Sequence, residues 1–167
     1  MAGDKKNERL YHCLNDKYVI DVYDKNGKII RKIDRPYKLV PTTAEDMKRY
    51  LDGFKSWPEV DISLVEKLTK MPGVKTVTER MFVDDVGNLW VETNELREEK
   101  DSLLRAYDIF NKDGMYVYKV WLERAPGLFK GEHMYRLERD DETDYRSLNR
   151  YRVIWSEPSP VGLCPSV

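Results

Sequence analysis

Apolar and polar residues alternate along two segments of the chain that carry the same kind of turn. Residues 18–33 alternate on both sides of Asp24-Lys-Asn-Gly27, and residues 103–122 do so around Asn111-Lys-Asp-Gly114. Alternation is typical of half-buried strands, and Asn-Gly or Asp-Gly supplies the positive φ that a tight turn needs. Each segment therefore predicts a β-hairpin.

Shorter runs predict further strands, and one long stretch breaks the β pattern. The further strands are expected at 9–14, 77–83, 88–92, 133–139 and 148–155, with the charged stretch 94–102 as a loop. Residues 36–73 predict a helical insertion. Thr42-Thr-Ala-Glu45 offers a capping box, with Thr43 and Asp46 as the alternative, and Asp61 can cap a second short helix.

Two internal matches suggest that the chain repeats. Asp21 to Gly27 matches Asp108 to Gly114 at an offset of 87 residues, and Lys32 meets Lys119 at the same offset. Glu79-Arg-Met-Phe82 matches Glu132-His-Met-Tyr135 at an offset of 53. A spacing of about 50 residues suits one four-stranded propeller blade. The longer offset would be one blade plus the insertion, with chance similarity of hairpins as the alternative.

Several strings resemble the C-terminal blades of six-bladed β-propellers of the NHL-repeat-like and TolB-like kind. They are Phe82 to Val91, Tyr107 to Gly114, Phe129 to Tyr135 and Asn149 to Val153, and Gly-Asn-Leu-Trp-Val is the most specific part. The resemblance covers residues 10–155. It implies a mainly β fold, a partial β-propeller of about 2.5 four-stranded antiparallel blades with a short helical insertion.

The resemblance also implies how one domain, residues 1–167, is divided. An incomplete blade (9–35), the insertion (36–73), a complete blade (74–124), an incomplete blade (129–156) and an irregular tail (157–167) follow one another. A partial propeller leaves sheet edges and apolar faces uncovered. We therefore expect self-association or a partner chain that completes the propeller, and a fragment of a larger propeller is the other interpretation.

Composition narrows the classes of partner. Hydrophobic residues make up 41% and charged residues 35%, which suits a folded chain. Lys+Arg (29) nearly balances Asp+Glu (30), so nucleic acid is not an expected partner. No apolar run is long enough to span a membrane, and no signal peptide is recognisable. The chain as written would be cytoplasmic, or exported if a leader precedes it.

Few residues can support metal or covalent chemistry. Two cysteines, Cys13 and Cys164, and two histidines do not form a zinc-binding pattern. Two unlinked thiols are expected, with a disulfide between them as the alternative. The sequence contains no Gly-x-Ser-x-Gly elbow and no Gly-x-Gly-x-x-Gly loop, so we expect no cofactor and no catalytic residue.

The candidate binding residues follow from the resemblance, because propellers bind ligands at the mouth of the central channel. If 79–82 and 132–135 are inner strands, Arg80 and His133 occupy equivalent positions that face the channel, and Glu79 points the other way. The secondary candidates are Glu92, Asn94, Glu95 and Arg97. The alternative for each is a solvated or paired polar side chain, and Trp90 is expected to pack between blades.

Two functions of different classes follow. The first is a non-catalytic β-propeller module for protein or small-ligand binding or for assembly. The alternative is part of a metal-dependent propeller hydrolase, such as a lactonase, or a lyase. Such sites gather Asp, Glu, Asn or His from several blades.

Overall fold

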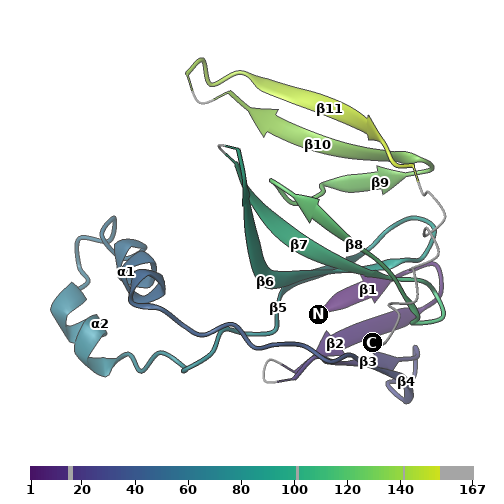
Figure 1. The fold of residues 1–167 in the computed structure, drawn as a ribbon, viewed down its shortest axis with the longest axis horizontal. Coiled ribbons are helices and arrows are strands. Elements are labelled where there is room, and N and C mark those ends of the chain that lie inside the picture. The colour runs from purple at the N-terminus through teal and green to yellow at the C-terminus, as the bar shows by residue number, and fades with distance from the viewer. Residues whose placement is uncertain (15–16, 101, 141, 155–167) are drawn as a thin grey trace, which may run out of the picture. The chain divides into compact units, whose positions relative to one another are not determined.

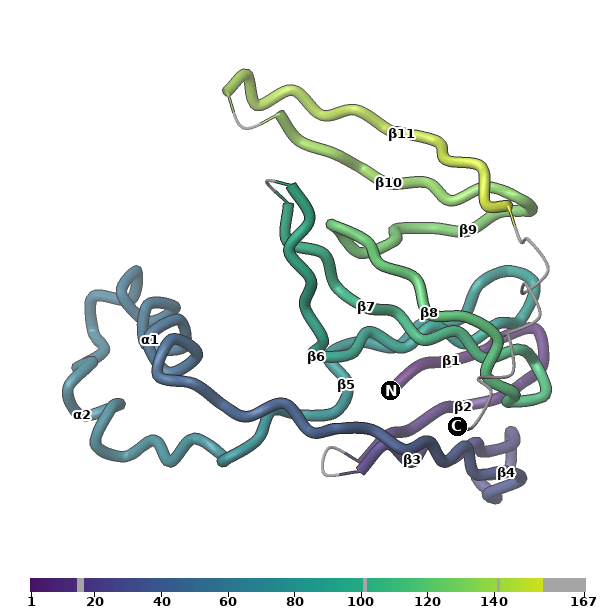
Figure 2. The backbone as a smooth tube through the Cα atoms, in the orientation of Figure 1, coloured from purple at the N-terminus to yellow at the C-terminus, as the bar shows by residue number. Residues whose placement is uncertain are grey.

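The computed structural model describes residues 1–14, 17–100, 102–140 and 142–154. They form eleven strands in three antiparallel sheets and two short helices (Figures 1 and 2). The chain divides into two compact units. The first comprises Met1–Val83 and Gly87–Arg124, and the second comprises Asp84–Val86 and the described residues from Ala125 onward. The mainly β prediction is confirmed.

The first unit contains two four-stranded meanders with the same strand order. Sheet 1 is β1 (Ala2–Asp4), β2 (Arg9–Cys13), β3 (Val19–Tyr23) and β4 (Ile29–Asp34). Sheet 2 is β5 (Thr78–Val83), β6 (Leu89–Glu99), β7 (Ser102–Phe110) and β8 (Tyr116–Leu122). The predicted hairpins are β3–β4 and β7–β8.

Two sequence predictions for these sheets were wrong. The charged stretch 94–102 is not a loop, because β6 runs on to Glu99 and pairs with β7 as far as Ser102. The loop was predicted because the stretch is rich in charged residues. A hairpin whose side chains are exposed to solvent tolerates such residues equally well. In addition, β1 was missed because three residues with a glycine carry no alternation, so sheet 1 has four strands from residue 2 rather than an incomplete set from residue 9.

The 87-residue match corresponds to equivalent hairpins. Asp24 Oδ1 accepts hydrogen bonds from the amides of Asn26 and Lys28, at 2.9 Å each. Asn111 Oδ1 accepts the matching bonds from Asp113 (2.9 Å) and Met115 (3.0 Å). The first strand of each hairpin, β3 or β7, also has a register shift at the matching position, between Val22 and Tyr23 in β3 and between Ile109 and Phe110 in β7. A shared bulge and turn indicate one structural element used twice.

Sheets 1 and 2 pack face to face around a single core. The sheet 1 side chains in this core are Ala2, Tyr11, Cys13, Ile20, Val22 and Ile33, and those of sheet 2 are Met81, Leu89, Val91 and Phe110. Alternation places each set on one face of its sheet. The expectation of two unlinked thiols stays a prediction, because Cys13 is buried here and Cys164 lies outside the described residues.

A buried carboxylate lies in the middle of this packing. Asp108 on β7 has no exposed surface. Its Oδ2 accepts a hydrogen bond from the Tyr18 hydroxyl at 3.0 Å and lies 2.5 Å from the Arg35 guanidinium, both from the sheet 1 side. Lys119 of the neighbouring strand lies 4.0 Å from Oδ1. The Arg35 guanidinium also lies 3.9 Å from the centroid of the Tyr116 ring.

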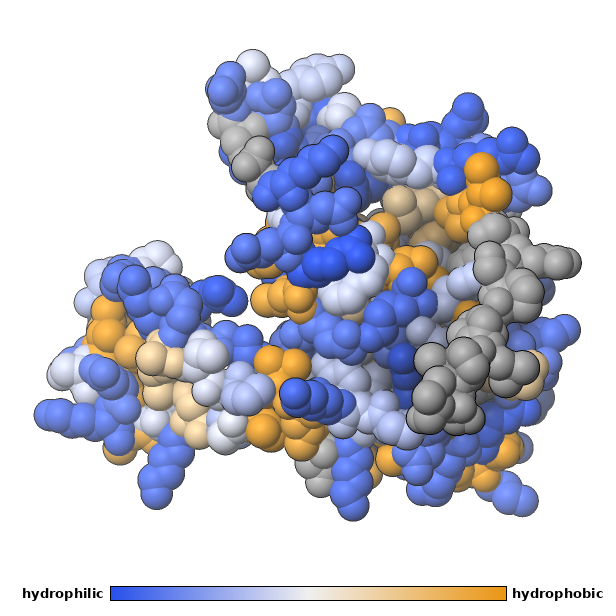
Figure 3. Space-filling view, viewed as in Figure 1, coloured by the Kyte–Doolittle hydropathy of each residue, from blue (hydrophilic) through white to orange (hydrophobic). Residues whose placement is uncertain are grey.

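The helical insertion lies between β4 and β5, as predicted. Helix α1 (Ala44–Asp52) begins at a capping box of Thr43 and Asp46, the alternative rather than the first choice, and α2 (Ile62–Leu68) is capped by Asp61. Pro41 and Val74 form a β-bridge where the segment leaves and returns to the sheets. Apolar side chains reach its surface (Figure 3), among them Leu64 and Leu68. No described helix is long and apolar enough to cross a membrane.

The second unit is built on a three-stranded sheet, sheet 3. Its order is β11 (Arg146–Arg152), β10 (His133–Arg139) and β9 (Leu128–Lys130). The match between residues 79–82 and 132–135 does not join equivalent strands. Residues 79–82 lie in β5, an edge strand, whereas β10 lies in the middle of its sheet. The short β9, unpredicted because of its three-residue length, takes the edge position. Trp155, the expected end of the last strand, lies outside the described residues.

Removing the Asp108 carboxylate should destabilise the first unit strongly. In Asp108→Ala, Arg35 loses its counterion and the buried Tyr18 hydroxyl loses its acceptor, so we expect a loss of about 3–5 kcal/mol in the free energy of unfolding. Urea unfolding followed by tryptophan fluorescence measures it. The exposed Asp113→Ala serves as control, and a loss below about 1 kcal/mol for Asp108→Ala would contradict the central role of this carboxylate.

The two matching turn glycines provide a paired comparison. Gly27 and Gly114 both have positive φ, +77° and +72°, so alanine at either should cost about 1–2 kcal/mol. A Cβ at Gly114 would also lie 3.0 Å from Arg31 Cδ and 3.1 Å from Ile33 Cγ1 of sheet 1, whereas a Cβ at Gly27 meets nothing within 4 Å. Thermal unfolding should therefore show the larger loss for Gly114→Ala, and equal losses would argue against close packing of this turn on sheet 1.

Candidate functional site

A polar pocket of about 520 Å³ lies between the helical insertion and the β6–β7 arm. It brings together two predicted binding residues, Glu79 and Asn94. The insertion side contributes Thr42, Asp46, Arg49, Met71, Pro72, Lys75 and Thr76, and sheet 2 adds Leu96, Leu103 and Arg105. Residues of the stretch 94–102 and of the insertion therefore line the same pocket.

Asp46 organises the helical side of the pocket. Its Oδ1 accepts a hydrogen bond from Lys75 Nζ at 2.7 Å and lies 4.0 Å from Arg49, while Oδ2 accepts the Thr43 amide of the capping box at 2.9 Å. The Lys75 ammonium, followed by the Thr43 amide, lowers the pKa of Asp46 to about 2. The carboxylate therefore joins α1 to the segment that precedes β5.

Glu92 is a buried carboxylate of sheet 2 whose ion-pair partner Arg105 lines the pocket. Its side chain is 5% exposed on β6, with Arg105 at 3.3 Å from Oε1 and Arg80 at 3.8 Å from Oε2. Tyr107 lies opposite Glu92 in the sheet register, and burial together with this carboxylate raises the pKa of the Tyr107 phenol. Arg105 also lines the polar pocket, so it connects the two sets of charges.

The other predicted residues have separate surroundings. The Asn94 amide donates to the Thr76 carbonyl at 2.5 Å, which ties β6 to the segment before β5. Arg97 lies 2.6 Å from Glu99 and 4.9 Å from the centre of the Trp121 ring. His133 is on β10 of the second unit, with its ring 6.4 Å from that of Tyr135. Glu95, also on β6, lies 2.6 Å from Lys119 Nζ. The binding role of all these residues stays a prediction.

Sequence reasoning missed three residues that matter here: Asp46, Lys75 and Arg105. Asp46 had a signal as a capping residue, but its ion pair with Lys75 joins positions 29 apart and leaves no local pattern. Arg105 sits in a stretch that the sequence assigned to an ordinary strand. Among the described residues, no group of three or more His, Cys, Asp or Glu side chains lies close enough to hold a metal ion.

The charges of the polar pocket largely neutralise one another. Of the lining residues, Asp46 pairs with Lys75, Arg105 pairs with Glu92 outside the lining, and the Asn94 amide donates to the Thr76 carbonyl. Such pairing is typical of groups that hold elements together. Chemically, the pocket can offer hydrogen bonds to a polar molecule.

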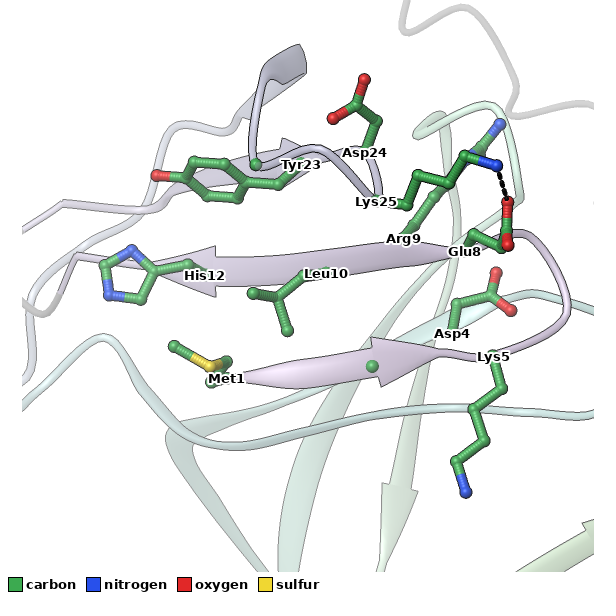
Figure 4. A pocket seen from close by; sticks show the side chains of 12 residues that line it. Met1, Asp4, Lys5, Glu8, Arg9, Leu10, His12, Tyr23, Asp24 and Lys25 are labelled. Atoms are coloured by element: carbon green, nitrogen blue, oxygen red, sulfur yellow. Dashed lines mark ion pairs between the residues drawn. The ribbon is translucent and has the colours of Figure 1, made fainter.

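A second hollow, of about 660 Å³, lies on the face of sheet 1 turned away from the core. We call this surface the open face and define it by Leu10, His12, Asp21 and Tyr23, which share one side of β2 and β3. Figure 4 shows Leu10, His12 and Tyr23 beside Met1 in the hollow, with the Lys25–Glu8 ion pair (3.1 Å) at its rim. Much of the surface that lines the hollow is apolar, and its lining also includes charged residues of both signs: Asp4, Lys5, Glu8, Arg9, Asp24 and Lys25.

Comparisons with protein-family models, curated proteins and solved structures found no match. The arguments about function therefore rest on the residues and geometry of this chain.

The Asp46–Lys75 contact should leave a signature at acidic pH. Because the folded-state pKa of Asp46 is depressed from 3.8 to about 2, its contribution is complete above pH 3.8 and is lost as the pH falls through 2. Urea unfolding at a series of pH values should show this loss in the wild type and not in Asp46→Asn. Glu45→Gln, an exposed carboxylate on the same helix, should behave like the wild type; an identical acid profile for Asp46→Asn would contradict the assignment.

Proposed function

We propose that the chain is a non-catalytic module of the β-propeller type whose function is assembly, and that the open face of sheet 1 binds a further β-sheet. The observation that carries the proposal is the use of the same meander twice. Sheet 2 packs on one face of sheet 1. The other face of sheet 1, the open face, is equivalent to the face that sheet 2 uses in this contact.

The correspondence follows from the 87-residue match. Asp108 and Phe110 lie on the face of sheet 2 that packs against sheet 1. Their counterparts in sheet 1 are Asp21 and Tyr23, which lie on the open face. In a stack of radial sheets, each sheet presents this face to the one before it. The open face is therefore the surface on which a preceding sheet would be expected.

The surface also has the composition of an interface. Leu10 is 38% exposed and Met1 75%, and both line the hollow beside the aromatic ring of Tyr23. Exposed apolar surface bounded by charged residues is typical of contact sites between proteins. The polar pocket is a weaker candidate for function because its charges are already paired.

A substitution in the centre of the open face tests the proposal. We expect the wild-type chain to self-associate with rising concentration, and Leu10→Glu to shift the chain to monomer, because a carboxylate would have to be buried without a partner. Sedimentation velocity over about two decades of protein concentration measures this.

The matched control is Leu64→Glu, which places the same charge on the exposed surface of α2, outside both sheets. It should associate like the wild type, and circular dichroism should show that both variants remain folded. A wild-type chain that is monomeric at every concentration, or a Leu10→Glu variant that associates normally, would overturn the proposal.

A further inference from the structure

The contact between sheets 1 and 2 shows how one sheet of this chain recognises the next. Asp108 on the third strand of sheet 2 receives a hydrogen bond from Tyr18 and an ion pair from Arg35. Tyr18 directly precedes β3, the third strand of sheet 1. A buried acid on the third strand of sheet 2 thus meets one donor just before the third strand of sheet 1 and another, Arg35, just after its fourth strand β4.

Asp21 holds the position of Asp108 in sheet 1 and lacks the donors from a neighbouring sheet. Its side chain is 10% exposed, and Lys32, the counterpart of Lys119, lies 2.9 Å from Oδ1. His12 is opposite on β2. Oδ1 of Asp21, like Oδ1 of Asp108, is buried without a hydrogen bond from the described residues. The difference is that Oδ2 of Asp108 also receives Tyr18 and Arg35 from the neighbouring sheet, whereas the described ion-pair partner of Asp21, Lys32, belongs to its own sheet. A buried carboxylate in this state is stabilised when a further donor arrives.

The turn beside Asp21 provides a second acceptor by the same correspondence. The Lys112 carbonyl in the β7–β8 turn accepts a hydrogen bond from Arg9 of sheet 1 at 2.6 Å and a longer one from Arg31 at 3.4 Å. The residue that matches Lys112 is Lys25, which lines the hollow of the open face. A sheet that docks on the open face therefore needs arginine side chains as well as apolar ones.

Sheet 3 carries such a surface, which we call the basic face. Arg146, Leu148 and Arg150 alternate on one side of β11, and all three are exposed. The register sets Leu148 opposite Leu137 and Arg150 opposite Tyr135, so these share the side. Leu128, Tyr135, Leu137 and Leu148 line a shallow hollow of about 470 Å³. As the third strand of its sheet in chain order, β11 corresponds to β3.

We propose that the basic face of sheet 3 in a second copy of this chain docks on the open face of sheet 1, with Arg146 or Arg150 pairing with Asp21. The inference rests on the proposed function and names its partner. Leu128, Leu137 and Leu148 would cover Leu10 and Tyr23, while the arginines supply the donors that Tyr18 and Arg35 supply to Asp108. Two different surfaces meet, so the contact is head-to-tail and can continue from copy to copy.

Head-to-tail contact makes a prediction that other modes of association do not. Asp21→Arg blocks the open face and leaves the basic face intact, whereas Arg146→Glu with Arg150→Glu does the reverse. Each variant alone should be monomeric. Mixed in equal amounts, they should form one-to-one dimers that do not grow, because one intact open face then meets one intact basic face. Sedimentation velocity and native mass spectrometry detect this product directly.

Two further variants separate the inference from effects on folding. Asp21→Asn keeps the shape of the side chain and should weaken association by about 30-fold or more, the loss expected for one partner of a buried charge pair. Lys48→Glu with Lys67→Glu makes the same charge change on the helical insertion and should associate like the wild type. Circular dichroism of each variant checks that it is folded.

The outcomes distinguish this inference from the proposal on which it rests. If Leu10→Glu abolishes association but the doubly reversed arginine variant associates normally, the open face binds another surface and the head-to-tail contact is wrong. If the mixture of reversed variants stays monomeric although each is folded, the Asp21–arginine pair is wrong. If Leu10→Glu leaves association intact, the assembly proposal itself falls.

Discussion

The packing of sheet 1 on sheet 2 depends on how a fully buried carboxylate is satisfied. Asp108 lies on the inner face of β7 among apolar side chains, where an unpaired charge would cost several kcal/mol. Tyr18 and Arg35 reach it from the other sheet, and the Arg35 guanidinium also stacks on Tyr116. Apolar surface alone would hold two sheets together in many orientations. The directed donors to Asp108 favour one orientation, because Tyr18 and Arg35 reach Oδ2 only when the two sheets are set as they are here.

The same element occurs twice in the chain, and its two copies differ in what covers them. Asp108 is covered by a neighbouring sheet, whereas among the described residues the strand neighbours of Asp21 are His12 and Lys32 of its own sheet. Sequence identity at these positions says nothing of that difference, because the turn, bulge and cross-strand lysine are the same in both. The functional proposals follow from this difference. The donors that Asp108 receives from a neighbouring sheet indicate which donors a docking sheet would supply to Asp21.

The polar pocket illustrates how chemically suggestive residues can serve the fold. The resemblance to propellers made Glu79, Glu92 and Asn94 candidate binding residues. In the structure, Glu92 holds Arg105 and Arg80, and Asn94 ties β6 to the backbone at Thr76. Asp46 and Lys75, which do most to join the insertion to the sheets, were not among the candidates.

Local physics let the sequence alone determine much of this protein. Positive φ at Gly27 and Gly114 and the alternation around them specify two hairpins, and Thr43 and Asp61 specify where the helices begin, because turns and caps use neighbours within a few residues. The sequence did not predict the strands with a weak hydrophobic pattern. β1 and β9 are too short to show alternation, and the charged end of β6 resembles a loop. Only the tertiary structure decided which acid is buried and which residues meet in the polar pocket. Those facts depend on contacts such as Tyr18 with Asp108, 90 positions apart, and no local pattern records which distant donor will reach a given carboxylate.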